Sequence, residues 1–411
     1  RYSDVAAQIQ PESVHIVSLT DPKGMTALEQ NYEYDLVNSA KLLEKYTDQQ
    51  IALSTKEGRV YTGTLLSGEG DVILATTEGI KVVKLDYVQE FSFPQLPDGL
   101  ITKPSLVWLL RAAQTGEQDV RVTYLTNGIN WQANYIGMLA PDDKSLSLAG
   151  WVTLDNQSGA AFQNAKLKLV AGDINRAPQA ASLTMAKDLV TGGDEPQVEE
   201  RAFFEYHLYE VARPVTVLDR QTKQIEFIAA PQVAAEKVFV YEPSPDYYPY
   251  NVITDPSYGV TGDKKVQVRV EFKNDAPSGL GAPLPRGVVR VYKEDIDGGA
   301  ELVGEDTIQH TPKDESVSLL LGEAFDIVGE RTQTQFVKLG ERSAEESYAI
   351  VLRNHKSEAT AVRVIEHLFR ASEAKMVSSS IPYELLDAHT LRYNVEVQPD
   401  SEARLEYTVR Y

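Results

Sequence analysis

Apolar and polar residues alternate along most of the chain, and this period of two predicts β-strands rather than helices. The last block gives the clearest case, because two segments each place four large apolar side chains on one face. These are Leu391, Tyr393, Val395 and Val397 in the first segment, and Leu405, Tyr407, Val409 and Tyr411 in the second. We therefore predict an immunoglobulin-like sandwich over residues 346–411, in a chain that is all-β and mainly antiparallel.

A second block, residues 35–97, combines one short helix with short alternating segments. Ser39 is a suitable N-cap for a helix that places Leu42, Leu43 and Tyr46 on one face. The strands predicted after the helix are Ile51–Thr55, Arg59–Ser67, Asp71–Thr76 and Ile80–Leu85, with glycine-containing turns between them. A helix and meander of this size are similar to a small Sm-like or SH3-like barrel. The block has no basic stripe, so we favour a docking role over RNA binding.

The stretch from Tyr124 to Tyr135 contains an Asn-Gly pair, which is a strong signal for a two-residue hairpin turn. Such a turn fixes the register of the two strands and sorts their side chains into an apolar face and a mostly polar face. The pairs predicted on the apolar face are Tyr124 with Trp131, Val122 with Ala133, and Val120 with Tyr135.

The polar face of this predicted hairpin is the one candidate ligand face in the sequence. It carries Asn130, Gln132 and Asn134, and the alternation of the following strand places Trp151 beside them. Amides next to an exposed indole suit sugar rings, through stacking and planar hydrogen bonds. We favour the alternative that a second sheet or a long loop covers this face and that the amides bond to backbone.

These patterns divide the chain into five parts. Residues 1–34 hold N-terminal strands that belong to a later sandwich, and 35–97 hold the helix and barrel. A β-sandwich follows over 98–275, then strands and a linker region over 276–345, and finally the sandwich of 346–411. Within the third part, residues 172–200 are rich in Ala, Gly, Pro and acidic residues, which predicts a long loop.

Composition narrows the range of partners and compartments. The net charge of −20 disfavours phosphate backbones and anionic lipid surfaces. The chain has no cysteine, which excludes disulfides, thiolate nucleophiles and cysteine-type zinc sites and fits an exported bacterial protein. No apolar run approaches the length that spans a membrane. We therefore predict an extracytoplasmic protein with no membrane span and no nucleic-acid partner.

Motifs for catalysis and metal binding are missing from the sequence. The histidines lie at scattered positions, and none shares a metal-ligand spacing with another; they are His15, His207, His310, His355, His367 and His389. The sequence contains no nucleophile elbow, phosphate-binding loop or dinucleotide fingerprint. We therefore predict no catalytic residues and no cofactor. Asp295, Asp297 and Glu301 leave calcium as an open alternative, although a hairpin turn explains the same residues.

Several segments along the chain together resemble a bacterial family, the domain of unknown function 4139 family, which is related to mucoidy-inhibitor-A-like proteins. The segments that carry the resemblance include "VTYLTNGINWQANY", "GWVTLDNQSGAAFQNAKLKLVAGDINR" and "YAIVLRNHKSEATAVRVIEHL". The resemblance implies a β-rich envelope or exported protein, and it supplies no catalytic residues. It also implies further strands before Arg1, so we expect the first sheet to have an open edge.

The sequence therefore predicts a non-enzymatic extracytoplasmic scaffold that associates with itself, as a subunit of a surface polymer or fibre. Two alternatives stay open. The first is an envelope module that binds carbohydrate or peptide, with cell-envelope polysaccharide as the partner. The second is a hydrolase of unfamiliar design.

Overall fold

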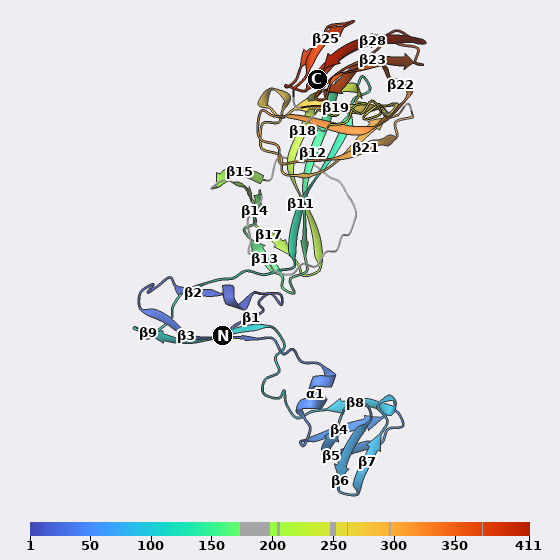
Figure 1. Cartoon of the computed structure of the whole chain (residues 1–411). Coiled ribbons are helices and arrows are strands. Elements are labelled where there is room, and N and C mark those ends of the chain that lie inside the picture. Colours follow the sequence, from blue (N-terminus) through green and yellow to red (C-terminus); the bar gives the residue numbers. More distant parts are fainter. Residues whose placement is uncertain (173–197, 204–205, 247–251, 261, 296, 372) are drawn as a thin grey trace. The chain divides into compact units, whose positions relative to one another are not determined.

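The computed structural model describes residues 1–411 except 173–197, 204–205, 247–251, 261, 296 and 372. Almost all of its elements are β-strands in mainly antiparallel sheets, which confirms the predicted fold class. The described part falls into two compact units (Figure 1). Unit 1 comprises residues 1–130, 154–165 and 215–222, and unit 2 comprises 131–153, 166–214 and 223–411.

Unit 1 opens with two small sheets that share a minor core. The first sheet has the order β1-β9-β3, with β1 at Tyr2–Ser3, β9 at Ser105–Ala112 and β3 at Met25–Glu33. The second sheet pairs β2 (His15–Ser18) with β10 (Val120–Thr123). The buried residues that form this core are Val5, Ile9 and Leu106. So small a core leaves much of these strands exposed to solvent.

The predicted helix and meander are confirmed as a separate part of unit 1. Helix α1 spans Ser39–Lys45, and Asn38 is its N-cap rather than Ser39, because the Asn38 side chain accepts a hydrogen bond from the Lys41 amide. The five-stranded sheet has the order β7-β6-β5-β4-β8. Its strands are β4 (Gln50–Thr55), β5 (Val60–Ser67), β6 (Val72–Thr76), β7 (Gly79–Val83) and β8 (Val88–Ser92). Apolar residues from both the helix and the strands form its core.

The hairpin predicted around Asn127-Gly128 is wrong. Gly128 does adopt a left-handed conformation, with φ of 79°. However, β10 pairs with β2, whereas β11 (Ile129–Leu139) belongs to a 13-stranded sheet, which we call the large sheet. In that sheet β11 runs parallel to β20 (Gly287–Glu294). The predicted apolar side of β11 is buried in the core of unit 2 through Ala133 and Tyr135. On the other strand Val122 and Tyr124 are partly buried in unit 1, and Val120 is exposed. The turn signal was therefore real, and the pairing partner lies far away in the sequence.

The first core of unit 2 is formed mainly by inward-facing side chains of the large sheet. Tyr135 and Leu148 are buried in it on β11 and β12 (Ser145–Asn156), and Phe227 joins them from β18 (Gln221–Tyr241). Further core residues come from β19 (Lys265–Lys273), β20, β21 (Ala300–Ile308) and β22 (Ser316–Gly340). A three-stranded sheet of unit 2 has the order β14 (Lys168–Ala171), β16 (Tyr206–Val211), β15 (Val198–Phe203). The short strands β13 (Phe162–Ala165) and β17 (Val215–Val217) pair with each other in unit 1. Most of the predicted loop 172–200 lies outside the described residues.

The second core of unit 2 confirms the pattern predicted for the C-terminal block. All eight residues expected to face inward there are buried. The strands of this block are β23 (Ser343–Asn354), β24 (Thr360–His367), β25 (Lys375–Ser379), β26 (Glu384–Leu385), β27 (Thr390–Val397) and β28 (Ser401–Arg410). The long strands β18 and β22 contribute residues to both cores. The second core therefore contains residues from 276–345 as well as from 346–411.

Candidate functional site

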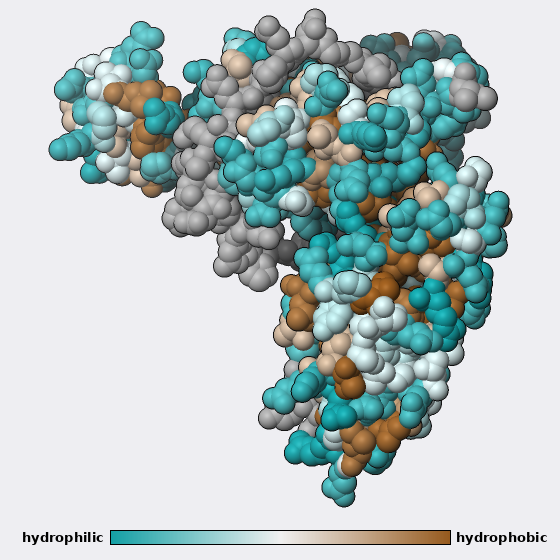
Figure 2. All heavy atoms as spheres, turned by 90° about the horizontal axis from the view of Figure 1, so that it is seen from above, coloured by the Kyte–Doolittle hydropathy of each residue, from teal (hydrophilic) through white to brown (hydrophobic). Residues whose placement is uncertain are grey.

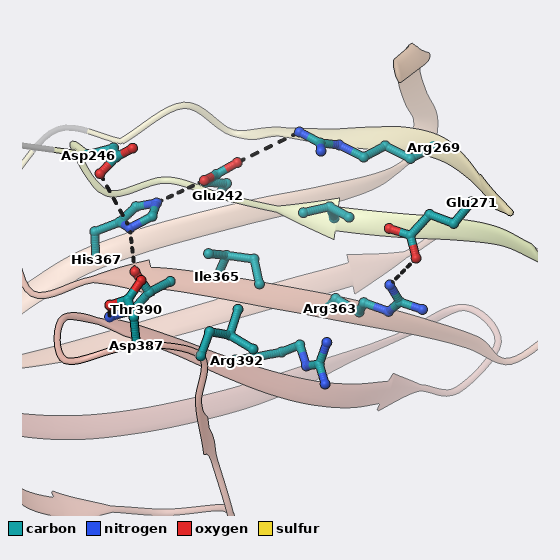
Figure 3. A pocket seen from close by; sticks show the side chains of 12 residues that line it. Glu242, Asp246, Arg269, Glu271, Arg363, Ile365, His367, Asp387, Thr390 and Arg392 are labelled. Atoms are coloured by element: carbon teal, nitrogen blue, oxygen red, sulfur yellow. Dashed lines mark hydrogen bonds and ion pairs between the residues drawn. The ribbon is translucent and has the colours of Figure 1, made fainter. Parts of the chain in front are cut away.

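A polar pocket lies on the outer face of the C-terminal block, over the strands β19, β18, β24 and β27 (Figure 3). Alternation places it there: Val364 faces the buried core, so its neighbours Arg363 and Ile365 face outward. The cavity measures about 440 Å³. Its lining residues are Val240, Glu242, Asp246, Arg269, Glu271, Arg363, Ile365, His367, Leu386, Asp387, Thr390 and Arg392. We call this site the mixed-charge pocket.

His367 anchors one end of the mixed-charge pocket. Its Nε2 donates a hydrogen bond to Glu242 Oε1 at 2.8 Å, and its Nδ1 lies 3.3 Å from Thr390 Oγ1. Asp246 approaches the same Nδ1 at 3.9 Å. The hydrogen bond to Glu242 raises the pKa of the His367 ring, and the same bond lowers the pKa of Glu242. The protonated, positively charged form of His367 is therefore favoured beside these carboxylates.

Arg363 lies at the end of the pocket opposite His367 and has two acidic partners. Its Nη1 donates to Glu271 on β19 at 2.6 Å, and its Nη2 donates to Glu236 on β18 at 3.2 Å. The Glu236 side chain is 71% exposed, whereas that of Glu271 is 31% exposed. An exposed ion pair contributes little to stability, so the contact with Glu236 is exchangeable.

Two more arginines complete the cationic lining. Arg269 bonds to Gln267 through Nε and Nη2 and lies 3.9 Å from Glu242. Arg392 donates from Nη2 to Glu384 at 2.5 Å. Its Nε atom is buried and has no hydrogen-bond partner among the described residues. Arg392 therefore has donor capacity that its one carboxylate partner does not use.

Two buried ion pairs lie beneath this face in the sandwich core. Arg331 bonds to Glu366 at 3.1 Å, and Arg370 bonds to Glu346 at 2.6 Å; all four side chains are fully buried. Arg370 also donates to three backbone carbonyls, those of Ile253, Asp255 and Tyr258. Glu366 directly precedes His367 on β24, so the core network and the pocket share one strand. Such a network fixes the backbone that presents the pocket.

The structure places the predicted ligand residues on another surface. Gln132, Asn134 and Trp151 lie on the side of β11 and β12 that faces away from the first core, and Asn130 is exposed in unit 1. Asn134 donates to Thr153 Oγ1 at 3.0 Å, as does Gln224 at 3.2 Å. Asn134 thus bonds to a neighbouring side chain and not to backbone. Sugar binding on this face stays a prediction.

Of the residues considered for calcium, Asp295 and Asp297 lie in the turn between β20 and β21, and Glu301 lies on β21. Asp295 N donates to Gly299 O at 2.8 Å, and Asp297 Oδ1 accepts from the Gly299 amide at 2.8 Å. Turn formation therefore accounts for these two aspartates. Throughout the part of the chain that the structure describes, no three His, Asp or Glu residues lie together in a way that could hold a metal ion.

Sequence reasoning did not single out the mixed-charge pocket. The segment "VRVIEH" on β24 does alternate Arg363, Ile365 and His367 on one side, which is a usable signal for a polar outer face. The partner strands could not be deduced, because β24 pairs in parallel with β18, which lies more than a hundred residues earlier in the sequence. The pocket thus depends on long-range pairing.

Comparisons with protein-family models, curated proteins and solved structures found no match for this chain. The family resemblance of the sequence therefore stays a prediction. Within the described residues, no helix has the length and apolar character needed to cross a membrane.

Proposed function

We propose that this protein is a non-enzymatic binding scaffold of the bacterial cell envelope, and that its mixed-charge pocket holds a polysaccharide ligand. The observation that carries the proposal is the lining of the pocket. Guanidinium, imidazole and carboxylate groups surround an apolar floor made by Val240, Ile365 and Leu386. Planar polar groups of both signs hydrogen-bond neighbouring hydroxyls, while the floor contacts the C–H face of a ring.

The size of the pocket supports a saccharide of one or two rings. About 440 Å³ lies within the usual range for small-molecule sites. Among the described lining residues none is Phe, Tyr or Trp, so hydrogen bonds and ion pairs supply the affinity rather than stacking. Weak affinity for a single unit suits a scaffold that engages a repeating polymer at many points.

A binding role fits the chemistry of His367 better than hydrolysis does. A general base must be largely unprotonated at the working pH. The hydrogen bond to Glu242 raises the pKa of His367 and favours the charged ring. The neighbouring Thr390 side chain is buried, which hinders attack on a substrate.

A glycan array probed with the purified full chain tests the proposal. Arg363→Gln removes one cation of the pocket lining, and Arg353→Gln is the matched control. Arg353 also bonds to a glutamate, Glu330 at 2.7 Å, but it is not among the residues that line the pocket. We expect glycan binding by the wild type and the control, and loss of binding in Arg363→Gln. Absence of any glycan signal would contradict the proposal.

Self-association is a second candidate role, favoured by one specific observation in unit 1. Large apolar side chains are exposed on the small N-terminal sheets, among them Leu28, Leu109 and Leu110 on β3 and β9. Figure 2 shows hydrophobic patches between hydrophilic regions on one face of the molecule. In the described part of the chain β3 pairs only with β9, which leaves its other edge open for a further strand.

A further inference from the structure

The mixed-charge pocket contains two neighbouring arginines, and their arrangement indicates a ligand that carries a negative charge. Ile365 and Arg392 are directly opposed on β24 and β27, and Arg363 lies two residues from Ile365 on the same face. Arg363 and Arg392 are therefore diagonal neighbours on adjacent antiparallel strands. Figure 3 shows their guanidinium groups on the same side of Ile365.

The acidic partners of these two arginines lie partly at the exposed rim. Glu236 is 71% exposed and Glu384 is 56% exposed, and each contacts its arginine through a single Nη atom. Exposed pairs of this kind contribute little free energy, so an incoming carboxylate displaces these glutamates at small cost. The two guanidinium groups have ten N–H donors in total. The described carboxylates engage only three of their nitrogen atoms.

From this arrangement we infer that the ligand of the mixed-charge pocket is an acidic saccharide, whose carboxylate binds between Arg363 and Arg392. The inference rests on the proposed glycan-binding function. A carboxylate matches the planar donor fork of arginine and can be held by one or both groups. A phosphate dianion fits less well, because Glu242, Asp246, Glu271 and Asp387 line the same pocket and repel the second charge.

The remaining lining residues have distinct roles in this arrangement. Glu271 holds Arg363 from the side away from the rim, since its carboxylate is the less exposed of the two partners of Arg363. Glu242 lies at the other end, where His367 Nε2 holds its carboxylate and where it offers an acceptor to sugar hydroxyls. The ring of the saccharide then lies over Ile365, between the arginine pair and the histidine.

The test uses calorimetric titration of the full chain with a hexamer of galacturonic acid and with its fully methyl-esterified form. The ester keeps the polymer and its hydroxyls but removes every negative charge. We expect binding of the acid form, and binding at least about tenfold weaker for the ester and for Arg392→Gln. The control Arg353→Gln should bind like the wild type.

Three outcomes would overturn the inference in distinguishable ways. Equal binding of acid and ester would refute the carboxylate site and leave the proposed glycan function intact. Absence of binding by both forms would refute the inference, and an empty glycan array would then refute the proposed function as well. If a penta-aspartate peptide bound as tightly as the acid hexamer, the pocket would be a general anion site and not a site for acidic sugars. Competition of millimolar inorganic phosphate with the acid hexamer would show the same.

Discussion

At the scale of single residues, the contact between His367 and Glu242 makes the stability of the protein depend on pH. His367 is held within hydrogen-bond distance of a carboxylate, and its side chain is only 7% exposed. The contact raises the pKa of the histidine and lowers the pKa of the glutamate. Each ionised group therefore favours the ionised form of the other.

The sign of the pH dependence follows from these two shifts. A raised histidine pKa gives stability that is complete below the ordinary value of 6.5 and is lost as the pH rises through the folded-state pKa. A lowered glutamate pKa gives stability that is present above 4.5 and is lost as the pH falls through the folded-state pKa.

We predict that His367→Gln destabilises the protein more at pH 6 than at pH 9. Urea unfolding of wild type and variant at both pH values measures the difference in free energy of unfolding. His355→Gln, an exposed histidine in the turn after β23, is the control and should show no such trend. An equal loss at pH 6 and pH 9 would mean that the ion pair does not stabilise the fold.

The buried pair Arg331–Glu366 allows a second prediction at this scale. Replacing Arg331 by Met leaves a buried carboxylate without its cation, which costs about 3–5 kcal/mol of unfolding free energy. Arg353→Met removes the partly exposed ion pair with Glu330 and should cost less than about 1 kcal/mol. Denaturant unfolding monitored by tryptophan fluorescence compares the two variants. Similar losses in both would argue against a role for the buried network.

At the scale of elements, alternation in the sequence predicted strands and their buried faces well. The inward faces of β27 and β28 and the meander of β4 to β8 match the pattern of apolar residues, because side-chain direction follows from the local period of two. Pairing was less predictable. The Asn127-Gly128 turn suggested a local hairpin, whereas β11 pairs in parallel with a strand about 150 residues away. The mixed-charge pocket was missed for the same reason.

The cap of α1 provides a prediction for one element. The helix has only seven residues, so its side-chain cap supplies a large share of its stability. We expect Asn38→Ala to cost about 1 kcal/mol and to accelerate amide hydrogen exchange in α1. Lys56→Ala, in the turn after β4, is the control. Unchanged exchange in α1 of the Asn38 variant would show that packing, rather than the cap, holds the helix.

At the scale of the whole molecule, the net charge of −20 favours solubility, and the exposed apolar strands of unit 1 favour association. We predict that the protein forms oligomers at high concentration in moderate salt, where charge repulsion is screened. Leu109→Lys should reduce them, because Leu109 lies opposite Glu29 and a lysine there forms an ion pair within the sheet. Light scattering at several concentrations measures the mass. If the protein stays a monomer at every concentration in salt, self-association is excluded.

The central claim concerns the mixed-charge pocket, and blocking that pocket tests it most directly. Ile365→Glu keeps every charged group of the lining and places a carboxylate on the pocket floor, directly opposite Arg392 and two residues from Arg363. The decisive measurement is a glycan array probed in parallel with the wild type, Ile365→Glu and the control Arg353→Gln. We predict glycan binding by the wild type and the control, and its loss in Ile365→Glu. Unchanged binding by the blocked variant would contradict the claim that this pocket holds the ligand.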